Sequence, residues 1–212
     1  MVGEASGRMQ KADCRDEIAL PAAMLAWLKY RKQRTRNSRK RFLVFFCSLF
    51  VKARVVYRLR DKYDFILIDC MPSLGMITLN ALTAADEVII PVQAQYLPAK
   101  GMTQLMKSIS LVKSHTNENL KIAGIVMTLV DSRTNLAKDV IDTIRTNYGM
   151  AIKIFDAQIP IAVKAAEAAK NGQSIFAYDR CGKPAKAYGE LVKEVIADAE
   201  REKQRDRASV TR

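Results

Sequence analysis

The feature that most constrains the fold is an alternation, from about residue 60 onward, of short apolar runs with longer amphipathic stretches. The runs are apolar at every position, which predicts strands covered on both faces. The stretches between them have apolar residues every three or four positions, as in helices that bury one side. This alternation predicts an α/β protein with a mostly parallel, doubly wound sheet. Strands are expected at 65–68, 87–92, 121–130 and, more weakly, 152–154, and helices at 102–112, 136–148 and 188–196.

The composition changes near residue 60. Residues 1–60 hold 15 of the 35 Lys and Arg but only 4 of the 22 Asp and Glu, so most of the net charge of +13 belongs to them. Within this part, residues 31–41 form a dense basic block, and such blocks repel and stay solvated. Residues 19–30 favour a short helix, and the apolar run 42–51 favours a buried strand. The overall basicity therefore indicates little about the regular part of the chain.

The sequence shows no membrane signal. No apolar run reaches the ~18 residues that a spanning helix needs. Residues 1–10 are polar, and no apolar segment with a cleavage site follows them. We therefore expect a cytoplasmic protein.

One predicted strand ends in an acidic residue, Asp69. The loop after it contains Pro72 and Gly75, and a helix is expected next. In phosphate-transfer folds an acid at this place holds Mg²⁺, and a glycine lets a backbone N–H approach a phosphate closely. An Asp in this position can also simply cap the next helix. These residues alone leave both interpretations open.

Four segments, in order, resemble the ParA/Soj-type partition ATPases. Residues 64–75, DFILIDCMPSLG, resemble the Walker B and switch II segment of that family. Residues 79–93, 124–135 and 159–167 continue the resemblance, which runs from about residue 58 to about residue 199. It implies a P-loop NTPase fold of the deviant Walker type. It also implies three parts: an unmatched basic extension (1–57), the C-terminal part of a ParA-like ATPase domain (58–200) and a polar tail (201–212).

The family binds ATP and Mg²⁺ and dimerises with the nucleotides between the subunits. Its ATP-bound dimer binds DNA without sequence preference, and a ParB-like partner stimulates the hydrolysis that releases the DNA. The resemblance thus implies a chromosome- or plasmid-partitioning protein that is associated with the nucleoid. Its expected partners are DNA, a ParB-like protein and a second copy of the chain, with no membrane.

The resemblance also implies roles for single residues on the nucleotide side. Asp69 would be the catalytic acid beside the γ-phosphate and would hold Mg²⁺ through water. Pro72 and Gly75 would shape the switch loop. The residues expected on the side of the site that faces the base are Thr128, Asp131 and Pro160.

Two basic residues are candidates for contact with DNA phosphates. Lys164 matches a position where the family carries a basic residue, often Arg, for this purpose. Arg133 belongs to the same group of exposed cations. A solvated basic face is an equally good interpretation of both residues, since phosphate binding normally uses several charges together.

The chain departs from the family at its phosphate-binding loop. The family carries a Lys-Gly-Gly-x-Gly-Lys-Thr/Ser loop whose N–H groups and lysines cradle the phosphates, and this sequence has none. We therefore expect a fold truncated at the N-terminus and a chain defective in ATP hydrolysis. The missing strand next to that of Asp69 should leave backbone groups without partners, unless residues 42–51 take its place.

Three explanations stay open at this point: a truncated or frameshifted product, a non-catalytic relative that binds DNA or a partner, and a second polypeptide that supplies the missing half. A septum-site relative such as MinD is a further alternative. That family ends in a membrane-targeting amphipathic helix, and the tail 201–212 is too polar for one.

Overall fold

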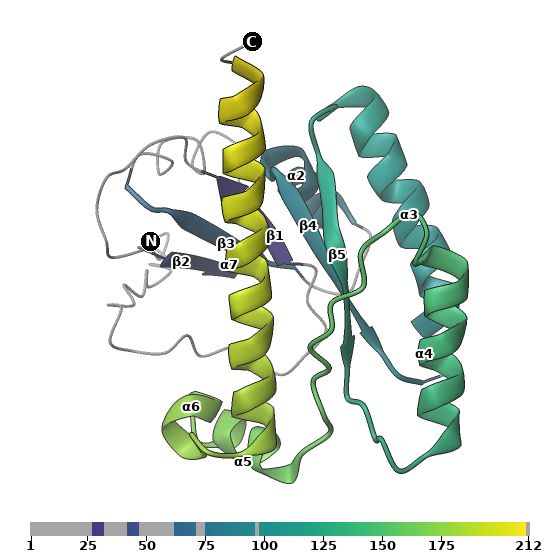
Figure 1. The fold of residues 1–212 in the computed structure, drawn as a ribbon, viewed down its shortest axis with the longest axis vertical. Coiled ribbons are helices and arrows are strands. Elements are labelled where there is room, and N and C mark those ends of the chain that lie inside the picture. Colours follow the sequence, from purple (N-terminus) through teal and green to yellow (C-terminus); the bar gives the residue numbers. More distant parts are fainter. Residues whose placement is uncertain (1–26, 32–41, 47–61, 71–74, 96–97, 211–212) are drawn as a thin grey trace, which may run out of the picture. The chain divides into compact units, whose positions relative to one another are not determined.

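The computed structural model describes residues 27–31, 42–46, 62–70, 75–95 and 98–210 (Figure 1). The strands are β1 (Trp27–Arg31), β2 (Phe42–Phe46), β3 (Phe65–Asp69), β4 (Glu87–Gln93) and β5 (Lys121–Thr128). The helices are α2 (Met76–Ala84), α3 (Pro98–His115), α4 (Asn135–Tyr148), α5 (Val163–Lys170), α6 (Ile175–Tyr178) and α7 (Lys183–Val210). Pro72, most of the basic block 31–41 and residues 19–26 and 47–51 lie outside the described residues.

The described residues fall into two compact units. The first holds β1, β2, β3, α2, the start of β4, most of α3 and the start of β5. The second holds the remainder of β4 and β5 together with α4, α5, α6 and α7. The strands are hydrogen-bonded in the order β2-β3-β1-β4-β5.

Strand β3 is paired along both edges. It runs parallel to β2, with Phe46 opposite Asp69, and antiparallel to β1, with Trp27 opposite Asp69. Residues 42–46 thus take the place beside β3 that the missing strand would leave open, the alternative that the sequence allowed. The prediction of a strand in 42–51 is confirmed for residues 42–46, whereas the helix predicted for 19–30 is wrong at 27–30. These residues pair with both β3 and β4, and this long-range pairing overrides the local pattern.

The first unit has a core formed by strands that are apolar on both faces. Residues 65–68 and 87–90 are buried, as the apolar runs predict. Helix α2 packs on this core through Ala81 and Leu82, which are fully buried. Its C-terminal end is held by the Asn117 amide, which donates to the carbonyl oxygens of Leu82 (3.1 Å) and Ala85 (2.7 Å). This side chain satisfies carbonyls that the helix itself leaves without a partner.

In the second unit, residues 153–161 run beside β5. The Phe155 N–H donates to the Ile125 oxygen (2.9 Å), and the Ile125 N–H donates to the Lys153 oxygen (2.8 Å). The weak strand predicted at 152–154 is thus reduced to a single parallel bridge between Ile125 and Ile154. Gly124 permits this approach, because a Cβ there would lie 2.8 Å from Phe155 Cε2 and 2.9 Å from the Lys153 oxygen.

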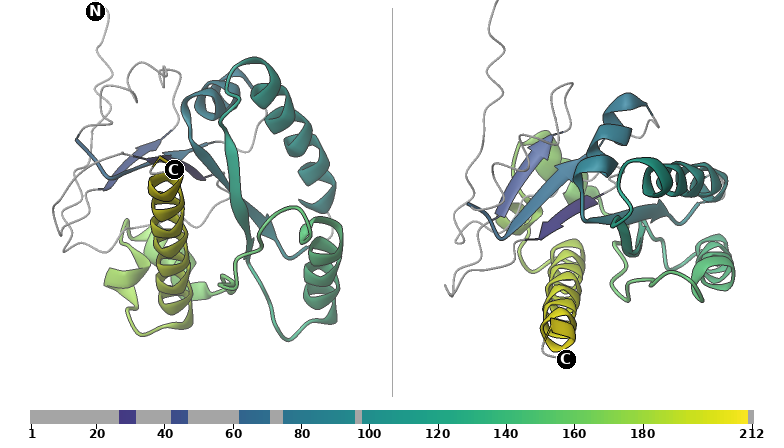
Figure 2. Two further views of the ribbon diagram at one scale, coloured as in Figure 1. Left: turned by 45° about the horizontal axis from the view of Figure 1, so that its top comes forward. Right: turned by 90° about the horizontal axis from the view of Figure 1, so that it is seen from above.

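Helix α7 continues through Val210, so most of the predicted polar tail is helical. Glu194 joins this helix to the 153–157 segment by accepting from the N–H groups of Asp156 (3.2 Å) and Ala157 (2.8 Å). Lys153 adds an ion pair with Asp198 (2.5 Å). Figure 2 shows α5 and α6 beside the N-terminal end of α7, where Ala168, Ile175 and Ala185 form a small core. None of the described helices combines the length and the apolar character needed to cross a membrane.

Candidate functional site

Asp69 is the last residue of β3 and follows four buried residues. Its side chain is half-buried at the carboxyl end of the strand. Within the described part of the chain, no side chain forms a hydrogen bond or an ion pair with this carboxylate. Burial raises the pKa of Asp69 from 3.8 to about 6, because removal from water disfavours the charged form.

A carboxylate in this position fits the magnesium side of a phosphate site. Mg²⁺ is typically held by one or two carboxylates, several waters and the phosphates of the substrate. Among the described residues, no group of three or more His, Cys, Asp and Glu side chains could hold a metal ion. The raised pKa agrees with a carboxyl group that lacks a cationic partner.

Gly75 is the N-cap residue of α2 and belongs to the same unit as Asp69. It is exposed, and its carbonyl oxygen accepts from the Leu79 N–H at 3.1 Å. Its φ of −82° does not require glycine. Glycine would matter here only because a residue without a side chain lets a phosphate come close to its backbone N–H. Pro72, between Asp69 and Gly75, lies outside the described residues.

Neither neighbour of β3 fits the phosphate cradle. Strand β1 is antiparallel, so it ends at Arg31 opposite Phe65, at the far end of β3 from Asp69. Strand β2 is parallel and ends beside Asp69, but the sequence has no glycine between Gly7 and Gly75. A loop that wraps phosphates with its backbone N–H groups needs glycines. The Asp69 carboxylate fits Mg²⁺, whereas the chain does not provide the cradle for the phosphates.

The predicted base-side residues lie in the second unit. Thr128 ends β5, and its carbonyl oxygen accepts from the Ala94 N–H at 3.0 Å. The next residue, Leu129, has a left-handed φ of 50°, a conformation that costs energy for a side chain of this size. Val130 then forms a parallel bridge with Pro160. The structure thus brings the Thr128 turn and Pro160 together.

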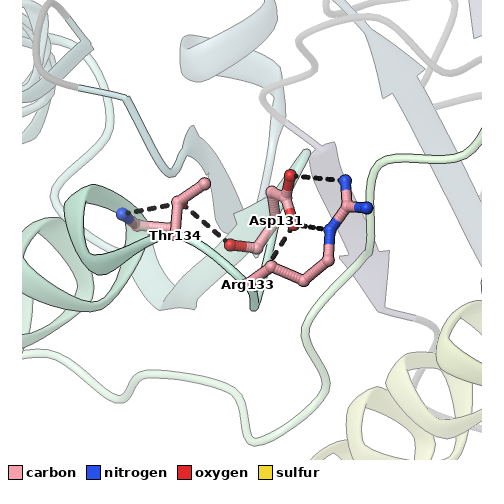
Figure 3. A network of polar contacts seen from close by, with 4 residues as sticks. Asp131, Arg133 and Thr134 are labelled. Carbon is pink, nitrogen blue, oxygen red and sulfur yellow. Dashed lines mark hydrogen bonds and ion pairs between the residues drawn. The ribbon is translucent and has the colours of Figure 1, made fainter.

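Asp131 and Arg133 form a bidentate ion pair (Figure 3). Arg133 donates from Nε to Oδ1 and from Nη2 to Oδ2, both at 3.0 Å. This contact lowers the pKa of Asp131, mainly through the side-chain hydrogen bond. Thr134 caps α4 with its side chain and donates from Oγ1 to the Asp131 carbonyl oxygen at 3.0 Å. The sequence predicted separate roles for Asp131 and Arg133, and the structure pairs them with each other.

Lys164 lies in the first turn of α5 and is also paired. Its Nζ lies 3.0 Å from Oδ2 of Asp179, which ends α6. Beside this pair, Tyr178 donates its hydroxyl to Glu167 at 3.0 Å. Sequence reasoning missed Asp179, because residues 15 positions apart on two helices give no local signal of contact.

The αβ alternation, with an acid at the end of a core strand, is typical of the P-loop NTPase fold class. Solved structures support this class. The cobyrinic acid a,c-diamide synthase from Mycobacterium smegmatis, with bound ATP analog and magnesium, is 34% identical with a TM-score of 0.57, covering 68% of this chain and 52% of that one. The cell division ATPase MinD from Pyrococcus furiosus is 25% identical with a TM-score of 0.53, covering 68% and 56%.

Sequence relatives narrow the class to a family. The AAA domain family matches residues 39–122. The chromosome-partitioning ATPase Soj of Treponema pallidum is 42% identical over 71% of this chain and 58% of its own length. The sporulation initiation inhibitor protein Soj of Bacillus subtilis is 41% identical over 68% of this chain and 56% of its own length. The chromosome partitioning protein ParA of Caulobacter vibrioides is 40% identical over 72% of this chain and 59% of its own length. The chain belongs to the ParA/Soj-type partition ATPase family, and it spans less than two thirds of the length of these relatives.

Proposed function

We propose that this chain is a ParA-family partitioning protein that binds DNA without sequence preference and does not hydrolyse ATP by itself. The observation that carries the proposal is Asp69, a half-buried carboxylate at the end of a core strand within a segment that resembles Walker B. The relatives at about 40% identity support the partitioning role.

The cofactors of the intact family are ATP and Mg²⁺, and Asp69 is the residue that would hold the metal through water. Bound Mg²⁺ balances the negative charge of the phosphates. Gly75 would lie at the switch loop with Pro72, and Thr128, Asp131 and Pro160 would lie near the base. The chain offers no glycine-rich cradle, so we assign it no turnover of its own.

The proposed partners are DNA and a ParB-like protein, and in the intact family a second copy associates in the presence of ATP. Lys164 supports contact with DNA, because its side chain is 61% exposed at the start of α5. Arg133 is 85% exposed and, like Lys164, it is already paired with an acid, which in its case is Asp131. The proposed setting is the cytoplasm, on the nucleoid, in chromosome or plasmid segregation.

Phosphate release from ATP tests the catalytic part of the proposal. The purified 212-residue chain is expected to release no phosphate above background with Mg²⁺ present. The matched control is Asp69→Ala. Robust hydrolysis that depends on Mg²⁺ and disappears in Asp69→Ala would overturn the assignment of a hydrolysis-defective chain.

A second candidate function is a regulatory relative that binds DNA or a partner without nucleotide. The basic block within residues 31–41 favours it. DNA binding that is sensitive to salt and independent of ATP would support this alternative. If the binding vanishes on deletion of residues 1–57 and is unchanged by Lys164→Ala, the DNA-binding activity belongs to residues 1–57 alone.

Membrane targeting separates this proposal from a MinD-like role. Residues 201–210 continue α7 with a mostly charged sequence, which offers no apolar face of the kind that inserts into lipid. We therefore expect no co-sedimentation with liposomes. Sedimentation that is lost when residues 201–212 are removed would favour the MinD-like role.

A further inference from the structure

The ion pair between Lys164 and Asp179 joins an exposed cation to a largely covered carboxylate. The Lys164 side chain is 61% exposed, whereas that of Asp179 is only 18% exposed. The lysine therefore has room to move, and the acid does not. Solvent reaches the pair from the lysine side.

Asp179 is fixed by its backbone as well as by its surroundings. Its N–H donates to the Ile175 oxygen at 2.8 Å, and its own carbonyl oxygen accepts from the Gly182 N–H at 3.1 Å. The neighbouring Tyr178 hydroxyl binds Glu167, one turn along α5 from Lys164. These contacts hold α6 against α5 and fix the backbone of Asp179.

The surrounding charge is otherwise mostly positive. Exposed basic residues on this stretch of the chain are Lys170, Arg180, Lys183 and Lys186. The negative charge of Asp179 raises the pKa of Lys164, chiefly through their hydrogen bond. A phosphate that approaches Lys164 therefore meets two acidic side chains, Asp179 and Glu167, and the first of them is already paired with the lysine.

We propose that Asp179 is an internal competitor for DNA phosphate, so that Lys164 must leave Asp179 before it can bind the backbone of DNA. The inference rests on the proposed binding of DNA by this chain. When Lys164 binds phosphate it first loses its ion pair with Asp179. Phosphate binding therefore yields less free energy than it would for an unpaired lysine. Asp179 therefore weakens non-specific binding and favours release.

The test is a titration of a fluorescein-labelled duplex of mixed sequence with the full chain, at NaCl concentrations of about 50 to 200 mM, where phosphate contacts respond strongly to salt. We expect Asp179→Asn to bind about two- to five-fold more tightly than the unchanged protein, the range open to one exposed ion pair. In a Lys164→Ala background, Asp179→Asn is expected to raise the affinity for DNA no more than Asp142→Asn does, the control for the loss of one negative charge. Asp179→Ser serves as a second variant if Asp179→Asn does not fold.

The charge control is Asp142→Asn, which removes one exposed negative charge from α4 in the same unit. If Asp179→Asn gains no more than Asp142→Asn, or keeps its extra gain without Lys164, the competitor role is overturned while DNA binding stands. If no variant and not even the unchanged chain binds the duplex at the lowest salt, the proposed DNA binding and this inference both fail.

Discussion

At Asp69 the fold keeps a carboxyl group where burial disfavours its charge. The group has no cationic partner among the described residues, and its pKa is raised to about 6. A carboxyl group that weakens the folded state at neutral pH is unlike an ordinary helix cap. It is typical of a site that serves a ligand.

The first prediction concerns the stability of Asp69→Asn. Because the pKa of Asp69 is higher in the folded chain than in the unfolded chain, this carboxyl favours folding below about pH 4, and the contribution is lost as the pH rises through about 6. An amide does not ionise, so Asp69→Asn should have a higher free energy of unfolding than the unchanged protein at pH 7.5. The difference should vanish near pH 4. Urea denaturation at both pH values measures it.

Asp142→Asn is the control for this measurement, since Asp142 is exposed on α4. It should not reproduce the gain at pH 7.5. A loss of stability in Asp69→Asn at pH 7.5 would mean that the ionised carboxylate has a stabilising partner, which would contradict the site described above.

The polar contacts of single residues were the part least open to prediction. The apolar run 65–68 predicted Asp69 at a strand end, and the structure agrees, although the catalytic role that the Walker B resemblance implies stays a prediction. The pairs Asp131–Arg133 and Lys164–Asp179 depend on side-chain positions set by tertiary packing. An exposed cation in the sequence therefore gave no sign that an acid already holds it.

Among the elements, the approach of residues 153–155 to β5 depends on Gly124. Gly124→Ala would place its Cβ 2.8 Å from Phe155 Cε2, and we expect a loss of about 1–3 kcal/mol in the free energy of unfolding. Thermal and urea denaturation measure this loss. The matched control is Gly189→Ala in α7, where a Cβ meets nothing within 4 Å. There the better helix propensity of alanine should stabilise by about 0.5–1 kcal/mol, and equal effects at both glycines would contradict the described packing.

The attachment of α7 gives a third prediction. Glu194→Ala removes the acceptor for the N–H groups of Asp156 and Ala157. Asp156 is exposed and its N–H can turn to water, but Ala157 is buried, and a buried donor left without a partner costs about 1–3 kcal/mol. Urea denaturation should show a loss in this range, together with faster amide exchange at 156 and 157. Glu190→Ala, one turn earlier at an exposed position of the same helix, should change neither. Unchanged exchange in Glu194→Ala would show that this side chain does not hold the segment.

The elements themselves were largely predictable, and the exceptions have a physical reason. The strands 65–69, 87–93 and 121–128 and the long helices follow from apolar patterns that each segment carries by itself. Strand β1 does not, because residues 27–31 are ordered by pairing with β3 and β4. The bridge at Ile154 likewise depends on β5 beside it.

At the scale of the whole molecule, the chain belongs to a family of ATPases but lacks the phosphate-binding loop of that family. Relatives at about 40% identity establish the ParA/Soj-type family, while the strands beside β3 supply no glycine-rich loop. The family match begins at residue 39, upstream of the boundary predicted at residue 58, which stays a prediction. The Asp69 carboxylate is thus suited to Mg²⁺, whereas this sequence does not provide the loop that would hold the phosphates.

The most direct test restores the phosphate side. A chimera would carry, in place of residues 1–57, the N-terminal part of a family member that has the Lys-Gly-Gly-x-Gly-Lys-Thr/Ser loop. Phosphate release from ATP would be measured with and without Mg²⁺. We predict that the chimera hydrolyses ATP only with Mg²⁺, and that Asp69→Ala in the chimera lowers the rate by at least about 100-fold. A folded chimera that is inactive, or equally active without the Asp69 carboxylate, would contradict the assignment of Asp69 as the magnesium-side acid.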